Sequence, residues 1–317
     1  MGDVCFITNR WTGVNNMDKI DMQIISHLLN NCRKPDSQIG NIVGISGSAV
    51  KSRIQKMIDK KTIEKFTLKI EPPVLGYSVL YFVVTGTDVE YILDQIKLIG
   101  EPFFVIPCVG SITVCSIVVK GDPNQKMELA KKILKDIRVL AIFEAKNPEI
   151  RSDLTKTDLQ IIEILLKDPR LKIEQVAKIA NLSTKTVTRS LDKLQNDEAI
   201  QFTLLFNPKE MSRFIPFAIL VGMEENAKDV FQRLEKKFGK SFMQKPFMHM
   251  NQVVLFFYSD DIFKVDDTTQ MVQKVEGVRS VDLFIPKKVS FPQKWIKDSI
   301  NEVKNSKRLH LSYQIHS

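Results

Sequence analysis

The sequence predicts an α+β protein in which two winged helix-turn-helix domains alternate with two ferredoxin-like βαββαβ sandwich domains. Two observations carry this prediction. One long segment is written twice along the 317-residue chain, and each copy opens with short helical patterns before strands and helices alternate. The composition agrees, because 44% hydrophobic and 26% charged residues are typical of a folded globular protein.

The repeat is clearest at the start of each copy. "DMQIISHLL" at Asp21–Leu29 is matched by "DLQIIEILL" at Asp158–Leu166, 137 residues later. At the same shift the following pairs align: Arg33 with Arg170, Ser46 with Ser183, Val50 with Val187 and Ile63 with Ile200. The chain is therefore a tandem duplication rather than a fusion of two unrelated domains.

Each copy begins with the pattern of a helix-turn-helix. In the first copy a helical face ends before Pro35, Ser37 is expected to cap a second helix, and Gly44 ends that helix. Ser46 then caps a third helix. Asn181 replaces the glycine in the second copy and tolerates the same left-handed backbone. The β-rich runs 63–70 and 200–206 that follow are expected to form the strands of two wings.

The remainder of each copy predicts the order βαββαβ. In the first copy the strands are expected at 78–84, 102–109, 112–120 and 139–145, with helices at 88–99 and 127–137. In the second copy the strands are expected at 214–222, 242–250, 253–259 and 280–286, with helices at 227–238 and 265–275.

These patterns divide the chain into six parts. They are an N-terminal extension (1–16), winged helix 1 (17–75), ferredoxin-like domain 1 (76–148), winged helix 2 (149–210), ferredoxin-like domain 2 (211–290) and a basic C-terminal tail helix (291–317). An apolar stripe in the tail is formed by Trp295, Ile296, Ile300 and Val303. Because this stripe would otherwise expose a tryptophan, we expect the tail to dock on the protein.

The net positive charge of the chain favours a polyanionic binding partner. The formal net charge of +9 attracts polyanions, of which nucleic acid is the commonest in a cytoplasm. The outward faces of both third helices hold small, hydrogen-bonding and cationic side chains, with no acid before Asp59 and Asp192. Such faces suit the major groove. A solvated helix face or a protein-binding module is the alternative.

The candidate residues for double-stranded DNA divide into two groups. We expect base-edge contacts from Lys51, Ser52, Gln55, Thr186, Thr188 and Arg189, with Ser48 on the same exposed face. We expect phosphate contacts from Arg53, Lys56, Lys185 and Lys193.

The two helix-turn-helix segments, "GISGSAVKSRIQKMIDKKTIEKFT" and "NLSTKTVTRSLDKLQNDEAIQFT", resemble the Lrp/AsnC transcriptional regulators. In that family a winged helix precedes a βαββαβ effector and oligomerisation domain, and one unit per chain dimerises through the open sheet faces. The resemblance implies a sequence-specific DNA-binding regulator. It leaves two arrangements open here: an intrachain pseudo-dimer of the two sandwiches, or a homodimer of like copies.

The family also implies a small-molecule effector, at a Gly-x-x-Asp turn between the second and third sandwich strands. The matching positions here are Gly110 to Thr113 and His249 to Gln252, and neither stretch has the aspartate. The effector candidates are therefore Gly110, Thr113, His249 and Gln252, and the expectation is against an amino acid.

We expect a protein that is not an enzyme and needs no cofactor or metal. The sequence has no phosphate-cradling glycine loop or nucleophile elbow, and its cysteines and histidines lack metal-ligand spacing. Two alternatives remain. Siroheme decarboxylases resemble Lrp/AsnC proteins in both domains, and here His249 and Tyr258 lie in the corresponding region. An architectural protein that coats DNA would use the same fold.

The expected location is the cytoplasm, with no membrane partner. No apolar run approaches the roughly 20 residues that cross a bilayer. Met1–Asn16 also lacks the basic start and the long apolar stretch of a secretion signal.

Overall fold

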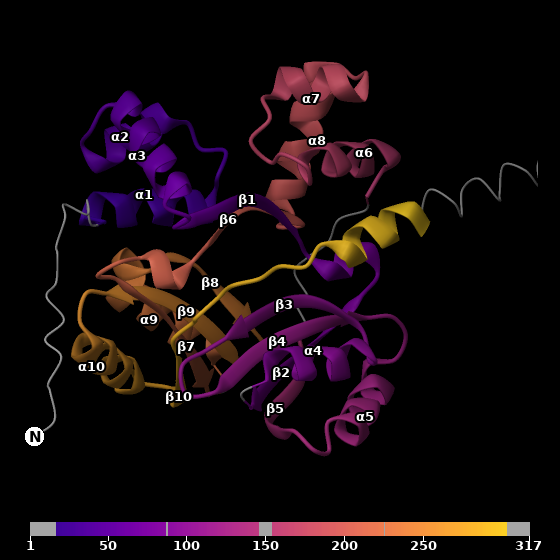
Figure 1. Ribbon diagram of the computed structural model, residues 1–317, viewed down its shortest axis with the longest axis vertical. Helices are drawn as coiled ribbons and strands as arrows, with labels where there is room; N and C mark the ends of the chain where they lie inside the picture. The colour runs from indigo at the N-terminus through magenta and orange to yellow at the C-terminus, as the bar shows by residue number, and fades with distance from the viewer. Residues whose placement is uncertain (1–16, 87, 146–153, 225, 303–317) are drawn as a thin grey trace, which may run out of the picture.

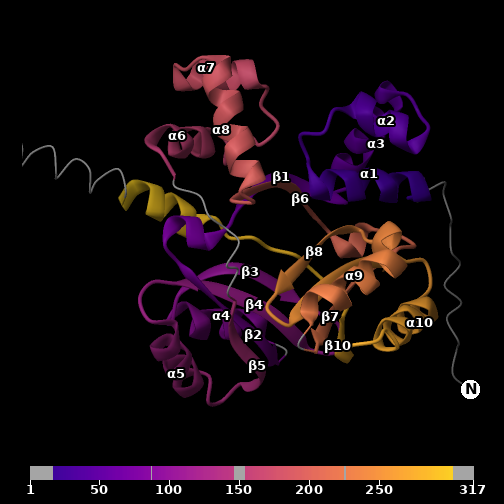
Figure 2. The same cartoon turned by 180° about the vertical axis from the view of Figure 1, so that it is seen from behind.

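The computed structural model describes residues 17–86, 88–145, 154–224 and 226–302. Two helical heads lie on one side of the molecule and two αβ sandwiches on the other, as the opposite views in Figures 1 and 2 show. Head 1 consists of α1 (Lys19–Asn30), α2 (Asp36–Val43) and α3 (Gly47–Asp59), and head 2 of α6 (Lys156–Leu165), α7 (Ile173–Ala180) and α8 (Thr184–Asn196).

Local capping sets the helix boundaries in both heads. Ser46 accepts a hydrogen bond from the Ala49 N–H at 3.2 Å, and Ser183 accepts one from the Thr186 N–H at 3.1 Å, so α3 and α8 begin where expected. The residues that end α2 and α7 adopt the left-handed conformation, with φ of 78° at Gly44 and 54° at Asn181. The expected cap at Ser37 is wrong, because the N-cap position of α2 is Pro35, two residues earlier, and it makes no side-chain cap.

Both sandwiches have the expected βαββαβ order. Sandwich 1 contains β2 (Ser78–Thr85), α4 (Val89–Lys97), β3 (Glu101–Pro107), β4 (Ile112–Val119), α5 (Pro123–Ile133) and β5 (Arg138–Ala145). Sandwich 2 contains β7 (Ile215–Met223), α9 (Ala227–Phe238), β8 (Gln244–His249), β9 (Gln252–Ser259), α10 (Ile262–Gln273) and β10 (Val278–Phe284). The sheet orders β3-β4-β2-β5 and β10-β7-β9-β8 are equivalent, and all neighbouring strands are antiparallel.

The strands expected as wings form but pair differently. β1 (Ile63–Ile70) and β6 (Ile200–Phe206) make a two-stranded antiparallel ribbon with each other, in a register that places Thr67 opposite Thr203. Among the described residues neither head has a second strand of its own beside this one. Each strand therefore satisfies its backbone groups on the equivalent strand of the other copy.

Because β1 pairs with β6, each head packs against the sandwich of the other copy. Head 1 rests on sandwich 2, where the Ser26 hydroxyl donates to the Met243 carbonyl at 2.6 Å and the Lys245 N–H donates to Asn30 at 2.8 Å. Head 2 shares a core with sandwich 1, in which Leu159 and Val118 belong to one apolar cluster. The two copies thus share cores within one chain instead of folding separately.

The chain after β10 ties sandwich 2 to sandwich 1. Residues 285–290, here called the strap, run antiparallel beside β3, and Val105 and Ser290 exchange backbone hydrogen bonds of 3.0 and 3.1 Å. Residues 294–302 then form a helix, here called the tail helix. Its Trp295 is 1% exposed and packs edge-on against Phe103, with ring centroids 5.9 Å apart. Val303, the last residue of the expected stripe, lies outside the described residues.

The open sheet faces also meet within the chain. Tyr81 on β2 stacks on Phe143 of β5 at 5.3 Å and contacts Phe247 of sandwich 2 at 6.0 Å. Of the two arrangements left open by the sequence, the structure shows the two sandwiches packed as an intrachain pseudo-dimer.

Candidate nucleic-acid interface

The third helix of head 1 presents the expected face to solvent. Val50, Ile54 and Met57 are buried against α1 and α2. Because a helix repeats every 3.6 residues, the opposite face is then exposed. It carries Ser48, Lys51, Ser52, Gln55 and Lys56. Two of these side chains have side-chain partners: the Gln55 amide donates to the Asp59 carboxylate at 2.8 Å, and the Ser48 hydroxyl lies 3.0 Å from the Ser46 hydroxyl.

The third helix of head 2 has a different exposed face. Lys185, Thr186 and Arg189 are exposed and Thr188 is half-buried. A shallow hollow on this face is lined by Thr184, Lys185, Thr188, Arg189 and Asp192. The Thr186 hydroxyl lies 2.8 Å from the Ser183 hydroxyl, so it belongs to the cap of the helix as well as to its surface.

Two of the expected phosphate contacts are held by carboxylates inside the heads. The Arg53 guanidinium donates to Asp18 and Asp21, both at 2.8 Å. The Lys193 ammonium pairs with Asp158, whose side chain is only 3% exposed. Both cations therefore join the third helix to the start of the first helix.

The two heads pair the aspartate at the start of the first helix with different residues of the third helix. Asp21 and Asp158 occupy matching positions, but the position of Arg53 holds Ser190 in the second copy and that of Lys193 holds Lys56 in the first. Ser190 donates to Asp158, and Thr155 completes the capping box of α6. Burial alone would raise the pKa of Asp158, but the hydrogen bonds from Lys193, Ser190 and Thr155 outweigh it and hold that pKa below its ordinary value.

A reciprocal pair of arginines holds the heads together. The Arg33 guanidinium of head 1 lies 5.0 Å over the Phe202 ring and donates to the Pro169 carbonyl at 2.7 Å. The Arg170 guanidinium of head 2 lies 4.7 Å over the Phe66 ring and donates to Asp36 at 3.1 Å. We call these contacts the arginine clamp. The repeat aligned Arg33 with Arg170, but nothing in the sequence indicated that each would cross to the other copy.

The four effector candidates do not form one site with these helices. Gly110 lies in the β3–β4 turn with φ of 79°, and Thr113 on β4 is buried. Gln252 is half-buried on β9, and the side chain of His249 lies outside the described residues. The first pair therefore belongs to sandwich 1 and the second pair to sandwich 2.

The described part of the chain has neither a cluster of metal ligands nor a membrane-spanning helix. No group of three or more His, Cys, Asp or Glu side chains there is arranged to hold a metal ion. No helix there is long and apolar enough to cross a membrane.

Comparisons with known proteins agree with this architecture. A family described as the AsnC-type helix-turn-helix domain matches residues 17–58, and one described as winged helix-turn-helix DNA-binding matches residues 154–201. The HTH-type transcriptional regulator Ptr1 of Methanocaldococcus jannaschii is 29% identical over 127 residues, which are 39% of this chain and 86% of that protein. The HTH-type transcriptional regulator LrpA of Pyrococcus abyssi is 40% identical over 92 residues, which are 29% of this chain and 63% of that protein.

The fold and its two exposed third helices define a helix-turn-helix protein. More particularly, both units begin with a segment that matches a helix-turn-helix family model, of the AsnC type in the first unit, and the chain is similar to regulators of the Lrp/AsnC type. Among solved structures, the siroheme decarboxylase NirDL aligns over 90% of this chain and 99% of its own, at 11% identity and a TM-score of 0.45. An AsnC family transcriptional regulator from Agrobacterium tumefaciens aligns over 44% and 97%, at 19% identity and a TM-score of 0.30.

Proposed function

We propose that this protein is a sequence-specific, DNA-binding transcriptional regulator that is not an enzyme. Its two recognition helices, α3 and α8, enter neighbouring major-groove segments of one duplex, about 34 Å or a multiple of that apart. The observation that carries the proposal is that each of the two heads, which lie on one side of the molecule (Figure 1), exposes cationic and hydrogen-bonding side chains on its third helix. In this role the protein acts in the cytoplasm, where it meets DNA.

The contacts divide by the surroundings of each side chain. Lys51, Ser52, Gln55, Thr186, Thr188 and Arg189 reach base edges, because they lie on the exposed faces of the two helices. Lys56 and Lys185 contact phosphates, since each is exposed and forms no ion pair with a described residue. Arg53 and Lys193 hold the recognition helices in place through their carboxylate partners.

The relatives support the regulator over the alternatives. Ptr1 and LrpA, which this chain resembles over 127 and 92 residues, are both named as HTH-type transcriptional regulators. The arginine clamp adds a structural reason. A pair of heads held at a fixed separation suits a site with two half-sites, whereas a protein that coats DNA needs no such separation.

A salt-dependent titration of the DNA upstream of the protein's own gene, beside a scrambled duplex, tests the proposal. A regulator binds its own site typically 10³-fold or more tightly than the scrambled duplex, and its affinity falls steeply as salt rises. Equal affinity for both duplexes indicates an architectural protein and contradicts sequence-specific regulation. No binding to either duplex at low salt contradicts the proposal altogether, and a tetrapyrrole is then the next ligand to try.

A further inference from the structure

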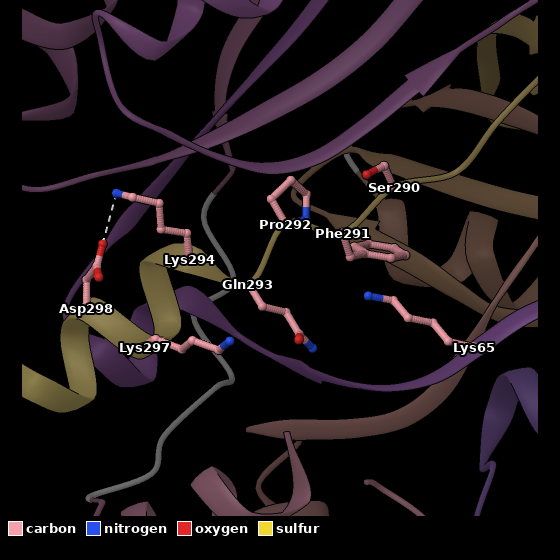
Figure 3. Close-up of a pocket in the computed structure, with 8 residues that line it drawn as sticks. All are labelled: Lys65, Ser290, Phe291, Pro292, Gln293, Lys294, Lys297 and Asp298. Carbon is pink, nitrogen blue, oxygen red and sulfur yellow. Dashed lines mark hydrogen bonds and ion pairs between the residues drawn. The ribbon is translucent and has the colours of Figure 1, made fainter. Parts of the chain in front are cut away.

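A hollow lies beside the ribbon, between β1 and the residues that lead into the tail helix. It has a volume of about 580 Å³, is open to solvent, and is bordered by β1, the end of the strap and the start of the tail helix. Its walls include Lys65, Ser290, Phe291, Gln293, Lys297 and Asp298, which Figure 3 shows around one space. A volume of roughly 300–1,000 Å³ is usual for the binding site of a small molecule.

Two positive charges enter this hollow without a negative partner. Lys65 extends from β1 and Lys297 from the tail helix, and their ammonium groups point into the space from opposite sides (Figure 3). Neither forms an ion pair with a described residue. Lys294 is different, because it pairs with Glu101 at 2.9 Å and with Asp298 at 3.0 Å. Like charges repel, so an anion between Lys65 and Lys297 lowers the electrostatic energy of the hollow.

The other walls are held in place by neighbours. The Gln293 side chain donates to the Thr67 hydroxyl at 2.9 Å and to the Leu68 carbonyl at 3.3 Å, which fixes the tail against β1. The Phe291 ring packs edge-on against Phe104, with centroids 6.3 Å apart. The hollow therefore combines two exposed cations with a packed aromatic ring in its wall.

We propose that this hollow binds a small dianion with a planar apolar body, either a dicarboxylate or a phosphate monoester. Lys65 and Lys297 neutralise its two charges, and its body packs on Phe291. Each chain has one such site, because Gln201 stands at the position in β6 that matches Lys65, and the tail helix has no counterpart in the first copy.

A ligand bound in this hollow would connect the tail helix to β1 of the ribbon. β1 continues from head 1 and pairs along its length with β6, which continues from head 2. A ligand between β1 and the tail helix therefore stabilises one placement of the heads over others. Binding itself is independent of the proposed function, whereas an effect of the ligand on DNA affinity rests on it.

Isothermal titration of the full chain with phenyl phosphate and with phthalate tests the proposal. Both probes are dianions above about pH 7, since the second pKa of a phosphate monoester is about 6. We expect saturable binding of at least one probe, with one molecule per chain. Lys65→Gln and Lys297→Gln should each weaken that binding by about tenfold or more, because each removes a charge-assisted hydrogen bond. Binding of phthalate alone supports a dicarboxylate, and binding of phenyl phosphate alone supports a phosphate monoester.

Lys236→Gln is the matched control, because it removes the same charge from an exposed position on α9 in sandwich 2. It should leave probe affinity unchanged. The proposal is wrong if neither probe saturates, or if the Lys65→Gln/Lys297→Gln double variant binds as tightly as the wild-type chain. It is also wrong if the double variant instead lowers the salt dependence of DNA binding while no probe binds, since the hollow would then contact DNA.

Discussion

Lys56 and Lys193 occupy matching positions on the two recognition helices, but their surroundings differ. Lys56 is exposed and forms no ion pair with a described residue, whereas Lys193 pairs with the buried Asp158. A lysine that binds a DNA phosphate displaces a counterion from the DNA. A lysine that stays paired with a carboxylate inside its own head displaces none. The same residue type at the same position thus has two roles.

This difference gives a matched pair of variants. Lys56→Ala should reduce the slope of log affinity against log salt by about 0.9, because one phosphate contact is lost. Lys193→Ala should leave that slope unchanged and lower the free energy of unfolding by about 1 kcal/mol, since its pair is partly screened by solvent. Salt-dependent fluorescence anisotropy and chemical denaturation measure the two quantities. Equal loss of salt slope in both variants would show that Lys193 leaves Asp158 to contact DNA.

Asp158 links the stability of head 2 to pH. Its pKa is lowered in the folded protein, because hydrogen bonds to its carboxylate outweigh the effect of burial. A carboxyl whose folded pKa lies below its unfolded value stabilises the fold at pH values above the unfolded pKa, near 3.9. That stabilisation disappears as pH falls through the folded pKa.

Asp158→Asn should therefore lower the free energy of unfolding by about 2 kcal/mol at neutral pH, as expected for lost hydrogen bonds to a charged group. The difference from the wild type should shrink as pH falls below about 4, where the wild-type carboxyl also loses its charge. Urea denaturation across pH measures it. Asp192→Asn, an exposed position on α8 of the same head, is the control and should show little change. A difference that stays constant down to pH 2 would contradict the assigned role.

At the scale of elements, the arginine clamp and the ribbon fix how the heads lie relative to one another. Arg33 and Arg170 each reach across to the other copy, where they stack on a ribbon phenylalanine and bond to the opposite head. Because these contacts sit between the heads, they favour one separation of α3 and α8. The clamp is thus expected to set which half-site spacing the protein accepts.

Inserting half a helical turn, about 5 base pairs, between the half-sites should lower wild-type affinity by about 100-fold, because one head then leaves the DNA. In an Arg33→Ala/Arg170→Ala variant the same insertion should cost about tenfold or less, since the heads can separate. Binding to duplexes of graded spacing measures both. Affinity for the original spacing shows whether the variant still binds DNA. If the variant still binds the original site and loses as much affinity as the wild type on the lengthened site, the ribbon alone sets the accepted half-site spacing.

Some elements follow from local sequence and others do not. The helices of both heads could be predicted because apolar periodicity, Ser46 and Gly44 are local signals. The pairing of β1 with β6 could not, because each strand has the composition of a wing and its partner lies in the other copy. The strap was also missed, since its pairing with β3 uses backbone groups that any sequence supplies.

In the candidate site, too, some features follow from local sequence and others do not. The exposed faces of α3 and α8 follow from helical periodicity, which places Lys51 and Arg189 opposite the buried residues. The roles of Arg53 and Lys193 depend instead on carboxylates of another helix, at distances that periodicity does not give. Aligned aspartates at positions 21 and 158 were the available signal for those roles.

At the scale of the molecule, the two copies pack on each other within one chain. The two largest cores each combine a head of one copy with strands of the other, so the exchange is built into folding. A homodimer of single units would have two identical third helices. This chain has two different ones, and the differences fall on the exposed face. The aligned pairs are Ser48 and Lys185, Lys51 and Thr188, Ser52 and Arg189, and Gln55 and Asp192.

A single chain should therefore prefer a site with two unlike halves. The half that meets α8 should require guanine opposite Arg189, because arginine pairs bidentately with the O6 and N7 atoms of guanine at about 1–3 kcal/mol of discrimination. The half that meets α3 has Ser52 at the matching position and should tolerate other bases there. Selection from randomised duplexes, with light scattering of the complex to count chains, measures both the consensus and the number of chains bound.

Exchanging the two residues sharpens this test. Ser52→Arg combined with Arg189→Ser should move the guanine requirement from one half of the selected site to the other, because the clamp and the ribbon are unaltered. The Ser52→Arg variant alone should require guanine in both halves. A perfectly two-fold symmetric consensus from a wild-type complex that contains one chain would contradict the prediction. A symmetric consensus from a complex of two chains would instead mean that like heads pair between chains on DNA.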